Sequence, residues 1–248
     1  MKNLITILCL CLFLNFILGC IDEEEVELWG ECYNIEWTTH LYLPANQLTG
    51  EIPSDIGQLI NLKHLHLFNN QLTGEIPESI GNLINLENLQ LFNNQLTGEI
   101  PESIGNLINL NSLLLYNNQL IGEIPFKIGN LINVNFLYLN DNQLTGQIPC
   151  EICNIGDSSP SLFNNQLCPP YPNCISQNNI DSFDTSECIE FSEIQGDLNY
   201  DGLINIQDVI MMVNFILNNH NNECSDINED GLIDILDIIN LLDIILDN

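Results

Sequence analysis

Hydrophobic positions recur at a fixed period along the first two thirds of the chain. Between residues 48 and 143 a 24-residue unit is repeated four times in full, beginning "LTGEIP" or "LIGEIP" and ending "NQ". Within a unit, the apolar positions Leu65 and Leu67 flank a polar one, which predicts a short strand with one face in a core. Gly74 and Pro77 then mark the turn that brings the chain back. One unit cannot bury its own apolar face, so we expect the units to stack into a solenoid in which each adds a strand to a parallel concave sheet.

A second pattern occupies the C-terminal fifth of the chain. Two acidic segments of twelve residues, "DLNYDGLINIQD" at 197–208 and "DINEDGLIDILD" at 226–237, each precede a segment whose apolar residues recur with the period of a helix. The two halves are alike at a spacing of 29 residues, which predicts two loop–helix units packed face to face. The expected apolar helix positions are Ile206, Val209, Ile210, Val213, Ile216 and Leu217 in the first unit, and Ile235, Ile238, Ile239, Leu242, Ile245 and Leu246 in the second.

The ends of the repeat array differ from its middle. A partial unit precedes residue 48 and a degraded one, "LTGQIPCEICNIGDSSPSLFNNQ", follows residue 143. Segments around Trp29 and Trp37, and after Cys150, are expected to cap the open ends of the core. A column of asparagines recurs once per unit and is expected to hydrogen-bond backbone groups of the neighbouring turn: Asn46, Asn70, Asn94, Asn118 and Asn142.

The pattern LxxLxLxxNxLxGxIPxxIGxLxx resembles the plant-type subclass of leucine-rich repeats, over residues 30 to about 170. The resemblance implies a leucine-rich repeat solenoid with a parallel β-sheet on the concave face and β or 3-10 turns on the convex side. Function in such a fold lies in side chains that point outward from the concave strands. Three outward columns are predicted: His40, His64, Asn88, Ser112 and Phe136; Tyr42, His66, Gln90, Leu114 and Tyr138; Pro44, Phe68, Phe92, Tyr116 and Asn140.

The concave face is the candidate ligand-binding surface. Phe68, Phe92 and Tyr116 are expected to be neighbours at roughly one strand spacing, about 5 Å. Exposed aromatic rings with polar neighbours suit a peptide or a sugar, because flat rings bury area with little loss of entropy. The candidate residues are Phe68, Phe92, Tyr116, His64, His66 and Tyr138. The alternative is that near-identical units copied an ancestral Phe without a ligand.

The two acidic twelve-residue segments resemble those of the type I dockerin domain, which binds calcium in the manner of EF-hands. The resemblance covers residues 196–248. It implies two calcium ions, which would fold the module as well as bind it, because clustered carboxylates repel until a cation neutralises them. The implied ligands are Asp197, Asn199, Asp201, Leu203, Asn205 and Asp208 in the first loop, and Asp226, Asn228, Asp230, Leu232, Asp234 and Asp237 in the second, the leucines through their carbonyls.

One departure bears on the partner. Cellulosomal dockerins usually carry Ser or Thr at the tenth and eleventh loop positions, where this chain has Ile206 and Gln207, then Ile235 and Leu236. The expected partner is therefore a divergent cohesin-like domain, or the module docks against its own chain.

Composition and the N-terminus point to an exported protein. There are 34 acidic and 3 basic side chains, for a net charge of −31, which disfavours nucleic acid and anionic membrane surfaces. The apolar run after Lys2 has the length of a secretory signal segment rather than a membrane span. It ends in "ILGC", which resembles the lipobox of bacterial lipoproteins and implies lipidation of Cys20 and attachment to the bacterial cell envelope or surface, with the membrane reached only through the lipid anchor. A plain signal peptide, and hence secretion, is the alternative.

The cysteines fit an oxidising compartment. Cys150, Cys153, Cys168 and Cys174 are expected to pair with one another, in any of three connectivities. With Cys20 lipidated, the remaining number of thiols is odd. Cys32, Cys188 and Cys224 are then left without assigned partners.

Together these patterns predict the following organisation: a lipoprotein-type signal peptide at 1–19, an acidic tether at 20–28, the repeat domain with its caps at 29–174, a linker at 175–195 and the dockerin-like calcium domain at 196–248. No catalytic arrangement is evident, so the expected function is a non-enzymatic adaptor that recognises a protein or glycan and docks in a calcium-dependent way. The alternatives are a rigid spacer and an accessory component of a polysaccharide-degrading assembly.

Overall fold

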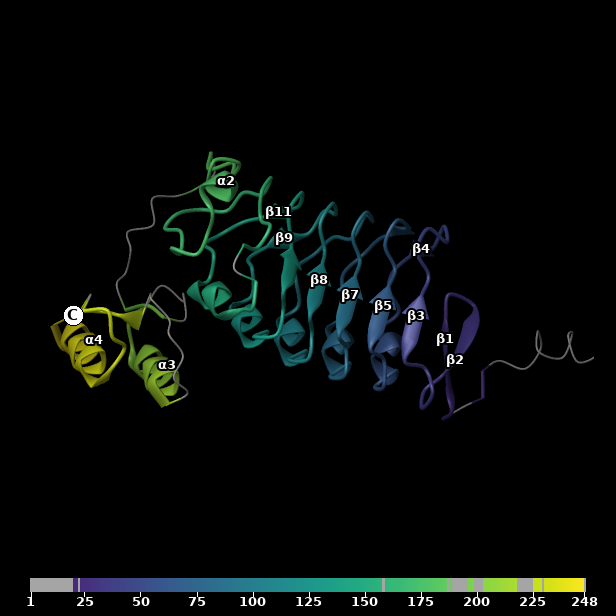
Figure 1. Ribbon diagram of the computed structural model, residues 1–248, viewed down its shortest axis with the longest axis horizontal. Helices are drawn as coiled ribbons and strands as arrows, with labels where there is room; N and C mark the ends of the chain where they lie inside the picture. The colour runs from purple at the N-terminus through teal and green to yellow at the C-terminus, as the bar shows by residue number, and fades with distance from the viewer. Residues whose placement is uncertain are drawn as a thin grey trace, which may run out of the picture.

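One strand from each repeat enters a single parallel sheet. In the computed structural model, residues 20–21, 23–157, 159–186, 188, 196–198, 203–217, 225–228 and 230–247 are described. The five strands lie side by side in the order β10–β8–β7–β5–β3 (Figure 1). Their bounds are His40–Tyr42 for β3, His64–His66 for β5, Asn88–Gln90 for β7, Ser112–Leu114 for β8 and Phe136–Tyr138 for β10. The predicted leucine-rich repeat solenoid is confirmed.

The opposite side of the solenoid is a row of 3-10 helices. They are η1 (Ser54–Gln58), η2 (Glu78–Asn82), η3 (Glu102–Asn106), η4 (Phe126–Asn130) and η5 (Cys150–Asn154). Each follows a proline, whose ring fixes φ for the turn. A glycine then lets the turns stack closely: a Cβ added at Gly81 would lie 2.5 Å from the Cβ of Ser103 in the next turn. This explains the Ile-Gly pair in each repeat.

Short two-residue strands connect the concave and convex sides. β4 (Thr49–Gly50) pairs with β6 (Gln71–Leu72), and β9 (Ile121–Gly122) pairs with β11 (Gln143–Leu144), both in parallel. Together with the concave sheet and the 3-10 row they enclose a core of Leu and Ile, so each turn rests on its neighbours rather than on itself.

The asparagine column holds adjacent turns together from inside. Asn118 donates from Nδ2 to the carbonyl of Leu91 in the preceding turn at 3.1 Å, and to Leu115 in its own turn at 2.9 Å. Its Oδ1 accepts the N–H of Leu96 at 3.1 Å. The same bonds recur at the predicted positions Asn70, Asn94 and Asn142, and also at Asn165 in the degraded unit. Asn46, predicted as the first member, is exposed, and its backbone N–H donates to Asn70 Oδ1 at 2.9 Å.

The N-terminal end of the core is closed by an antiparallel hairpin of β1 (Glu25–Leu28) and β2 (Glu31–Asn34). Val26 and Leu28 are 4% and 0% exposed and join the solenoid core. The segment predicted as a solvated tether is therefore part of the cap from Glu25 on. Its acidic residues alternate with apolar ones, and the apolar face is what the open end of the core requires.

At the other end, the chain folds back over the last turn. Helix α2 (Gln177–Ile180) lies here, and Ile175 and Phe183 pack onto the core. Asn179 is buried and its Oδ1 accepts the N–H of Leu162 at 3.0 Å. It supplies the acceptor that the strand carbonyl of a following turn gives at the equivalent positions Leu115 and Leu139. Residues 175–183, predicted as linker, thus belong to the cap.

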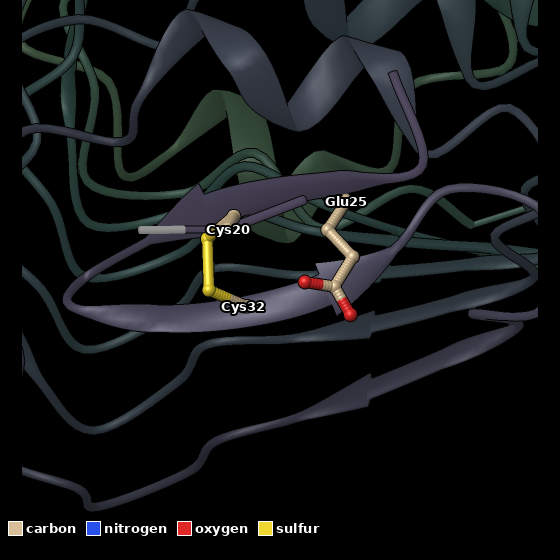
Figure 2. A group of neighbouring side chains, drawn as sticks. All are labelled: Cys20, Glu25 and Cys32. Carbon is tan, nitrogen blue, oxygen red and sulfur yellow. A yellow bond between two sulfur atoms is a disulfide. The ribbon is translucent and has the colours of Figure 1, made fainter. Parts of the chain in front are cut away.

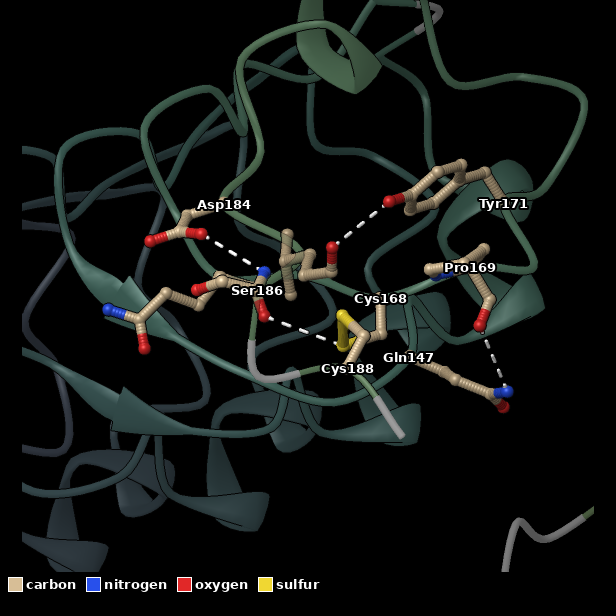
Figure 3. The surroundings of a disulfide bond; sticks show 9 residues. Gln147, Cys168, Pro169, Tyr171, Asp184, Ser186 and Cys188 are labelled. Carbon is tan, nitrogen blue, oxygen red and sulfur yellow. Dashed lines mark hydrogen bonds between the residues drawn. A yellow bond between two sulfur atoms is a disulfide. The ribbon is translucent and has the colours of Figure 1, made fainter. Parts of the chain in front are cut away.

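Disulfides fasten both caps. Cys20 is bonded to Cys32 and Cys153 to Cys174. Cys168 is bonded to Cys188 (Figure 3). Cys150 is also disulfide-bonded. The prediction that the four cysteines of the repeat end pair only with one another is wrong, because Cys168 takes Cys188, which the folded-back segment brings to it.

The C-terminal module contains two helices, α3 (Ile206–Leu217) and α4 (Ile235–Asp247). Its small core is formed by Leu198, Val209, Met212, Ile227 and Leu241. The predicted helices are present, but seven of the twelve predicted packing positions are exposed: Ile206, Ile210, Leu217, Ile235, Ile239, Leu242 and Leu246. Both helices are apolar almost all round, so periodicity could not identify the buried side. In the described part of the chain, no helix is both long enough and apolar enough to cross a membrane.

Candidate ligand face and calcium loops

The register of the concave sheet places the predicted columns side by side. His40 pairs with His64, His64 with Asn88, Asn88 with Ser112 and Ser112 with Phe136. The second column, starting at Tyr42 and His66, has the same register. The third column continues beyond the strands, because the N–H of Ala45 bonds to the carbonyl of Phe68 at 3.0 Å.

Three rings of the third column form one stack. The ring centroids of Phe68 and Phe92 are 4.5 Å apart and their planes differ by 7°; those of Phe92 and Tyr116 are 4.5 Å apart and differ by 8°. All three side chains are half-buried. Tyr138 on β10 lies 6.3 Å from Tyr116, tilted by 58°, and is not part of the stack. The sheet thus brings most of the candidate aromatic residues into one continuous surface.

The histidines gather at the N-terminal end of the same face. The rings of His40 and His64 are 4.5 Å apart, and His66 lies 6.1 Å from His64. The Nδ1 of His64 is 2.8 Å from the Nδ2 of Asn88, whose amide donates. The two ring nitrogens of His66 are buried without hydrogen-bond partners. Burial, followed by the nearby His64 and His40, lowers the pKa of His66 below its ordinary value.

The second acidic loop is folded by its own oxygen side chains. Asp226 accepts the N–H of Asp230 on Oδ1 at 3.1 Å and that of Gly231 on Oδ2 at 2.7 Å. Asn228 Oδ1 accepts the N–H of Asp230 at 3.0 Å, and Asp230 Oδ1 accepts that of Leu232 at 2.9 Å. Gly231 has φ +84, the left-handed conformation that the sixth position of a calcium loop requires. These bonds hold a set of oxygen donors around one turn.

The last residue of each loop closes it. Asp237 is fully buried; its Oδ1 accepts the N–H of Ile227 and its Oδ2 that of Asp234, both at 2.8 Å. Asp208 is also fully buried and bonds Leu198 and Asn205 in the same way, both at 2.8 Å. Asp237 Oδ1 also accepts the N–H of Asn228 at 3.2 Å. A carboxylate has about four lone-pair sites, so these three N–H bonds to Asp237 leave one site for a cation.

Most of the predicted calcium ligands lie within the described residues. The structure describes Asp197, Leu203, Asn205 and Asp208 in the first loop and all six in the second, while Asn199 and Asp201 lie outside the described residues. The donors are carboxylate, amide and carbonyl oxygens, which are the ligands calcium prefers. The donor set of the second loop therefore fits a calcium ion.

Cys20 has a different role from the predicted one. Cys20, Glu25 and Cys32 lie together (Figure 2), and in the described part of the chain they are the one group of three His, Cys, Asp or Glu whose ligand atoms are all within 4.8 Å of one another. The two sulfurs are joined to each other, so they are not metal ligands. One sulfur cannot hold both a disulfide and a lipid thioether, so the structure contradicts the prediction of lipidation at Cys20, and with it the odd count of thiols. The predicted signal peptide, residues 1–19, lies outside the described residues.

Sequence reasoning missed a second asparagine ladder beside the aromatic stack. Asn69, Asn93 and Asn117 have φ of 57, 55 and 55. Asn93 Nδ2 donates to Asn69 Oδ1, and Asn117 Nδ2 to Asn93 Oδ1, both at 2.6 Å. The available signal was the doubled Asn in each "NNQ", because Asn tolerates the left-handed region better than other residues with a side chain.

Comparisons with known proteins agree with this division of the chain. The leucine-rich repeat family model matches residues 38–59, 61–83, 85–107, 109–131 and 133–155, and the dockerin type I domain model matches residues 195–246. The chain therefore contains leucine-rich repeats followed by a dockerin type I domain. A comparison with curated protein sequences found no match.

Several solved structures resemble the repeat region. The plant peptide hormone receptor RGFR1 in complex with RGF2 is 42% identical, with a TM-score of 0.51, over 52% of this chain and 21% of the receptor chain. The receptor kinase HAESA ectodomain from Arabidopsis, with an IDA peptide hormone, is 39% identical, with a TM-score of 0.51, over 54% of this chain and 23% of that one. A plant ice-binding protein is 35% identical, with a TM-score of 0.50, over 52% and 42%. This chain thus spans less than a quarter of either receptor.

Proposed function

We propose that this protein is a non-enzymatic extracellular adaptor. Its concave face recognises a protein or glycan, and its C-terminal module docks to a partner protein in a calcium-dependent way. The observation that carries the proposal is the presence, on one chain, of a continuous aromatic face and of loops lined with oxygen donors, one of which is folded by its own side chains.

Similarity supports the recognition half. One structure that resembles the repeats is a plant peptide hormone receptor in complex with RGF2, and another is a receptor kinase ectodomain in complex with a peptide hormone ligand. In a repeat fold the outward side chains of the concave strands are free to differ from protein to protein, whereas the core positions are not. The aromatic and histidine columns are therefore the side chains that would determine which ligand this chain binds.

Two ions per module are expected, one in each loop. Calcium would be held by Asp226, Asn228, Asp230, Asp234 and Asp237, with the carbonyl of Leu232, and by the corresponding residues of the first loop. The partner is a cohesin-like domain that differs from those of cellulosomes, because Ile206, Ile235 and Leu236 are exposed apolar residues at the positions expected to contact it.

Export fits the disulfides. Three disulfides join described cysteines, and such bonds persist in oxidising compartments. We place the protein outside the cell, at the surface or secreted. A rigid spacer remains the second candidate, since a solenoid of near-identical turns sets a fixed distance between its ends, and membership of a polysaccharide-degrading assembly is the third.

Calorimetric titration of calcium into the whole chain tests the docking half. We expect about two ions per chain, with one site lost in Asp230→Asn. Asp243→Asn is the matched control, because Asp243 is an exposed acid on α4 outside the loops. If wild-type protein binds no calcium, the dockerin function fails.

Replacing Phe68, Phe92 and Tyr116 together by Ala separates recognition from the spacer. Loss of ligand or cell-surface binding with calcium binding retained supports recognition. Unchanged binding favours the spacer.

A further inference from the structure

An exposed column of isoleucines runs along one side of the solenoid. In each full unit, one isoleucine lies two residues after the 3-10 helix, where the chain turns from the convex toward the concave side: Ile60, Ile84, Ile108 and Ile132. These residues are 51%, 55%, 54% and 56% exposed. The strands that follow them lie side by side in one parallel sheet (Figure 1), so consecutive isoleucines lie roughly 4.8 Å apart, the spacing of neighbouring strands. Single exposed apolar residues are ordinary, whereas an aligned set marks a contact surface.

The strip around this column carries no charge. From the isoleucine of the 3-10 helix onward, the four units read "IGQLINL", "IGNLINL", "IGNLINL" and "IGNLINV", although the whole chain has 34 acidic residues. The nearest charges on the strand side, Lys63 and Glu87, pair with each other at 3.0 Å. Another exposed column of the same units is acidic throughout: Glu51, Glu75, Glu99 and Glu123. Two copies of a chain with a net charge of −31 repel each other, so the isoleucine strip is a side on which they can meet without bringing carboxylates together.

The backbone carbonyls of the column are already satisfied within the fold. Asn85 Nδ2 donates to the carbonyl of Ile60 at 2.9 Å. Asn109 donates to that of Ile84, and Asn133 to that of Ile108, both at 2.8 Å. These bonds tie each turn to the next and hold the isoleucines at a constant spacing. An apolar surface can therefore cover the column without leaving these carbonyls unpaired, which is the usual cost of covering backbone groups.

We infer that the isoleucine column is the contact surface of a symmetric dimer, formed with a second copy of this chain. A contact between two identical copies about a twofold axis must be self-complementary. A column of one apolar residue type at constant spacing meets this requirement. With the axis between the second and third isoleucines, Ile84 faces Ile108 of the second copy, and Ile60 faces Ile132 of the second copy. Because both columns have the same spacing, each isoleucine meets one of the other copy, which a partner without this repeat would not provide. Four half-exposed isoleucines bury less than the about 800 Å² per partner of a standard stable interface, so the dimer is weak and reversible, in the micromolar range.

Sedimentation equilibrium of the whole chain, with calcium present and from low to high micromolar concentration, tests this contact. We expect the wild-type chain to dimerise reversibly, and Ile84→Glu to raise the dissociation constant of the dimer at least tenfold, because the contact would bury an unpaired carboxylate. Ile121→Glu is the matched control. Ile121 is an exposed isoleucine (45%) on β9, away from the column, so the same added charge should leave the dissociation constant unchanged. Ile132→Glu takes the place of Ile84→Glu if that variant fails to fold.

Mixing two variants tests the register of the dimer. Ile84→Glu should pair with Ile108→Lys more tightly than either variant pairs with itself, because the two opposite charges would face each other. A wild-type chain that stays monomeric over the whole concentration range overturns the inference. Dimerisation that Ile84→Glu and Ile132→Glu leave unchanged also overturns it, since the contact would then lie elsewhere, and so does a mixture that pairs no more tightly than its components. Each of these results leaves the proposed ligand recognition and calcium binding untouched.

Discussion

The solenoid and the C-terminal module differ in how their folded states are stabilised. In the solenoid, each turn buries its leucines and isoleucines against its neighbours, and internal asparagines bond the backbone between turns. In the described part of the module, five buried residues form the core, while large apolar side chains remain exposed at matching positions of both halves, among them Ile210 with Ile239 and Leu217 with Leu246. Small cores seldom supply enough stability alone. We therefore expect the solenoid to be held by its own contacts and the module to depend on bound calcium.

Removing calcium should have the largest effect on stability, and we expect the effect to be confined to the C-terminal module. A ligand at a thousand times its dissociation constant adds about 4 kcal/mol to the stability of the state that binds it. We expect a chelator to abolish hydrogen-exchange protection in α3 and α4 and to leave β5, β7 and β8 protected. Equal loss in both regions would show that they do not differ in this way.

The same substitution in the two regions sharpens the comparison. Leu89 is fully buried in β7, so Leu89→Ala should lower the free energy of unfolding of the solenoid by about 2–5 kcal/mol. Leu246 is 79% exposed, and Leu246→Ala should change the stability of the module by less than about 0.5 kcal/mol. Denaturant unfolding with calcium present measures both.

The asparagine column should be worth less than a core leucine. Asn118→Ala leaves the N–H of Leu96 without its side-chain acceptor, while the carbonyl of Leu91 keeps the bond from Asn94. The loss should cost about 1–3 kcal/mol. Gln119→Ala, at the exposed neighbouring position, is the control. Equal unfolding midpoints for the two variants would contradict a structural role for the column.

The smallest effect concerns pH and the histidines. The pKa of His66 is lowered in the folded chain, mainly by burial, so below pH 6.5 the unfolded chain binds more protons at this site. Stability should therefore fall as the pH drops from about 6.5 toward the folded pKa, and His66→Gln should make that fall shallower. Thermal midpoints of both proteins at pH 8, where the imidazole is neutral, give the cost of the substitution itself. Parallel pH profiles would rule out His66 as the source.

Much of the solenoid could be predicted from its repeats. The 24-residue period fixes which residues share a column, and a parallel sheet with one strand per turn has a single register, so His64 and Asn88 had to be neighbours. The site at each acidic loop was equally local, since its oxygen donors lie within twelve residues of sequence.

Contacts between distant segments could not be predicted in this way. The partner of Cys168 depends on where residues 175–188 fold back, and the partner of Cys20 depends on the hairpin of β1 and β2. Likewise, whether the rings of Phe68, Phe92 and Tyr116 offer faces or edges depends on their rotamers in the stack.

The sequence by itself determined the repeat architecture, the strand register and the position of the acidic loops, because these follow from periodicity and from local chemistry. The tertiary structure alone decided the disulfides of the caps, the buried side of α3 and α4, and the parallel stacking of Phe68, Phe92 and Tyr116. These depend on packing between parts of the chain that no local pattern relates, since a side chain's exposed surface is whatever its neighbours leave uncovered.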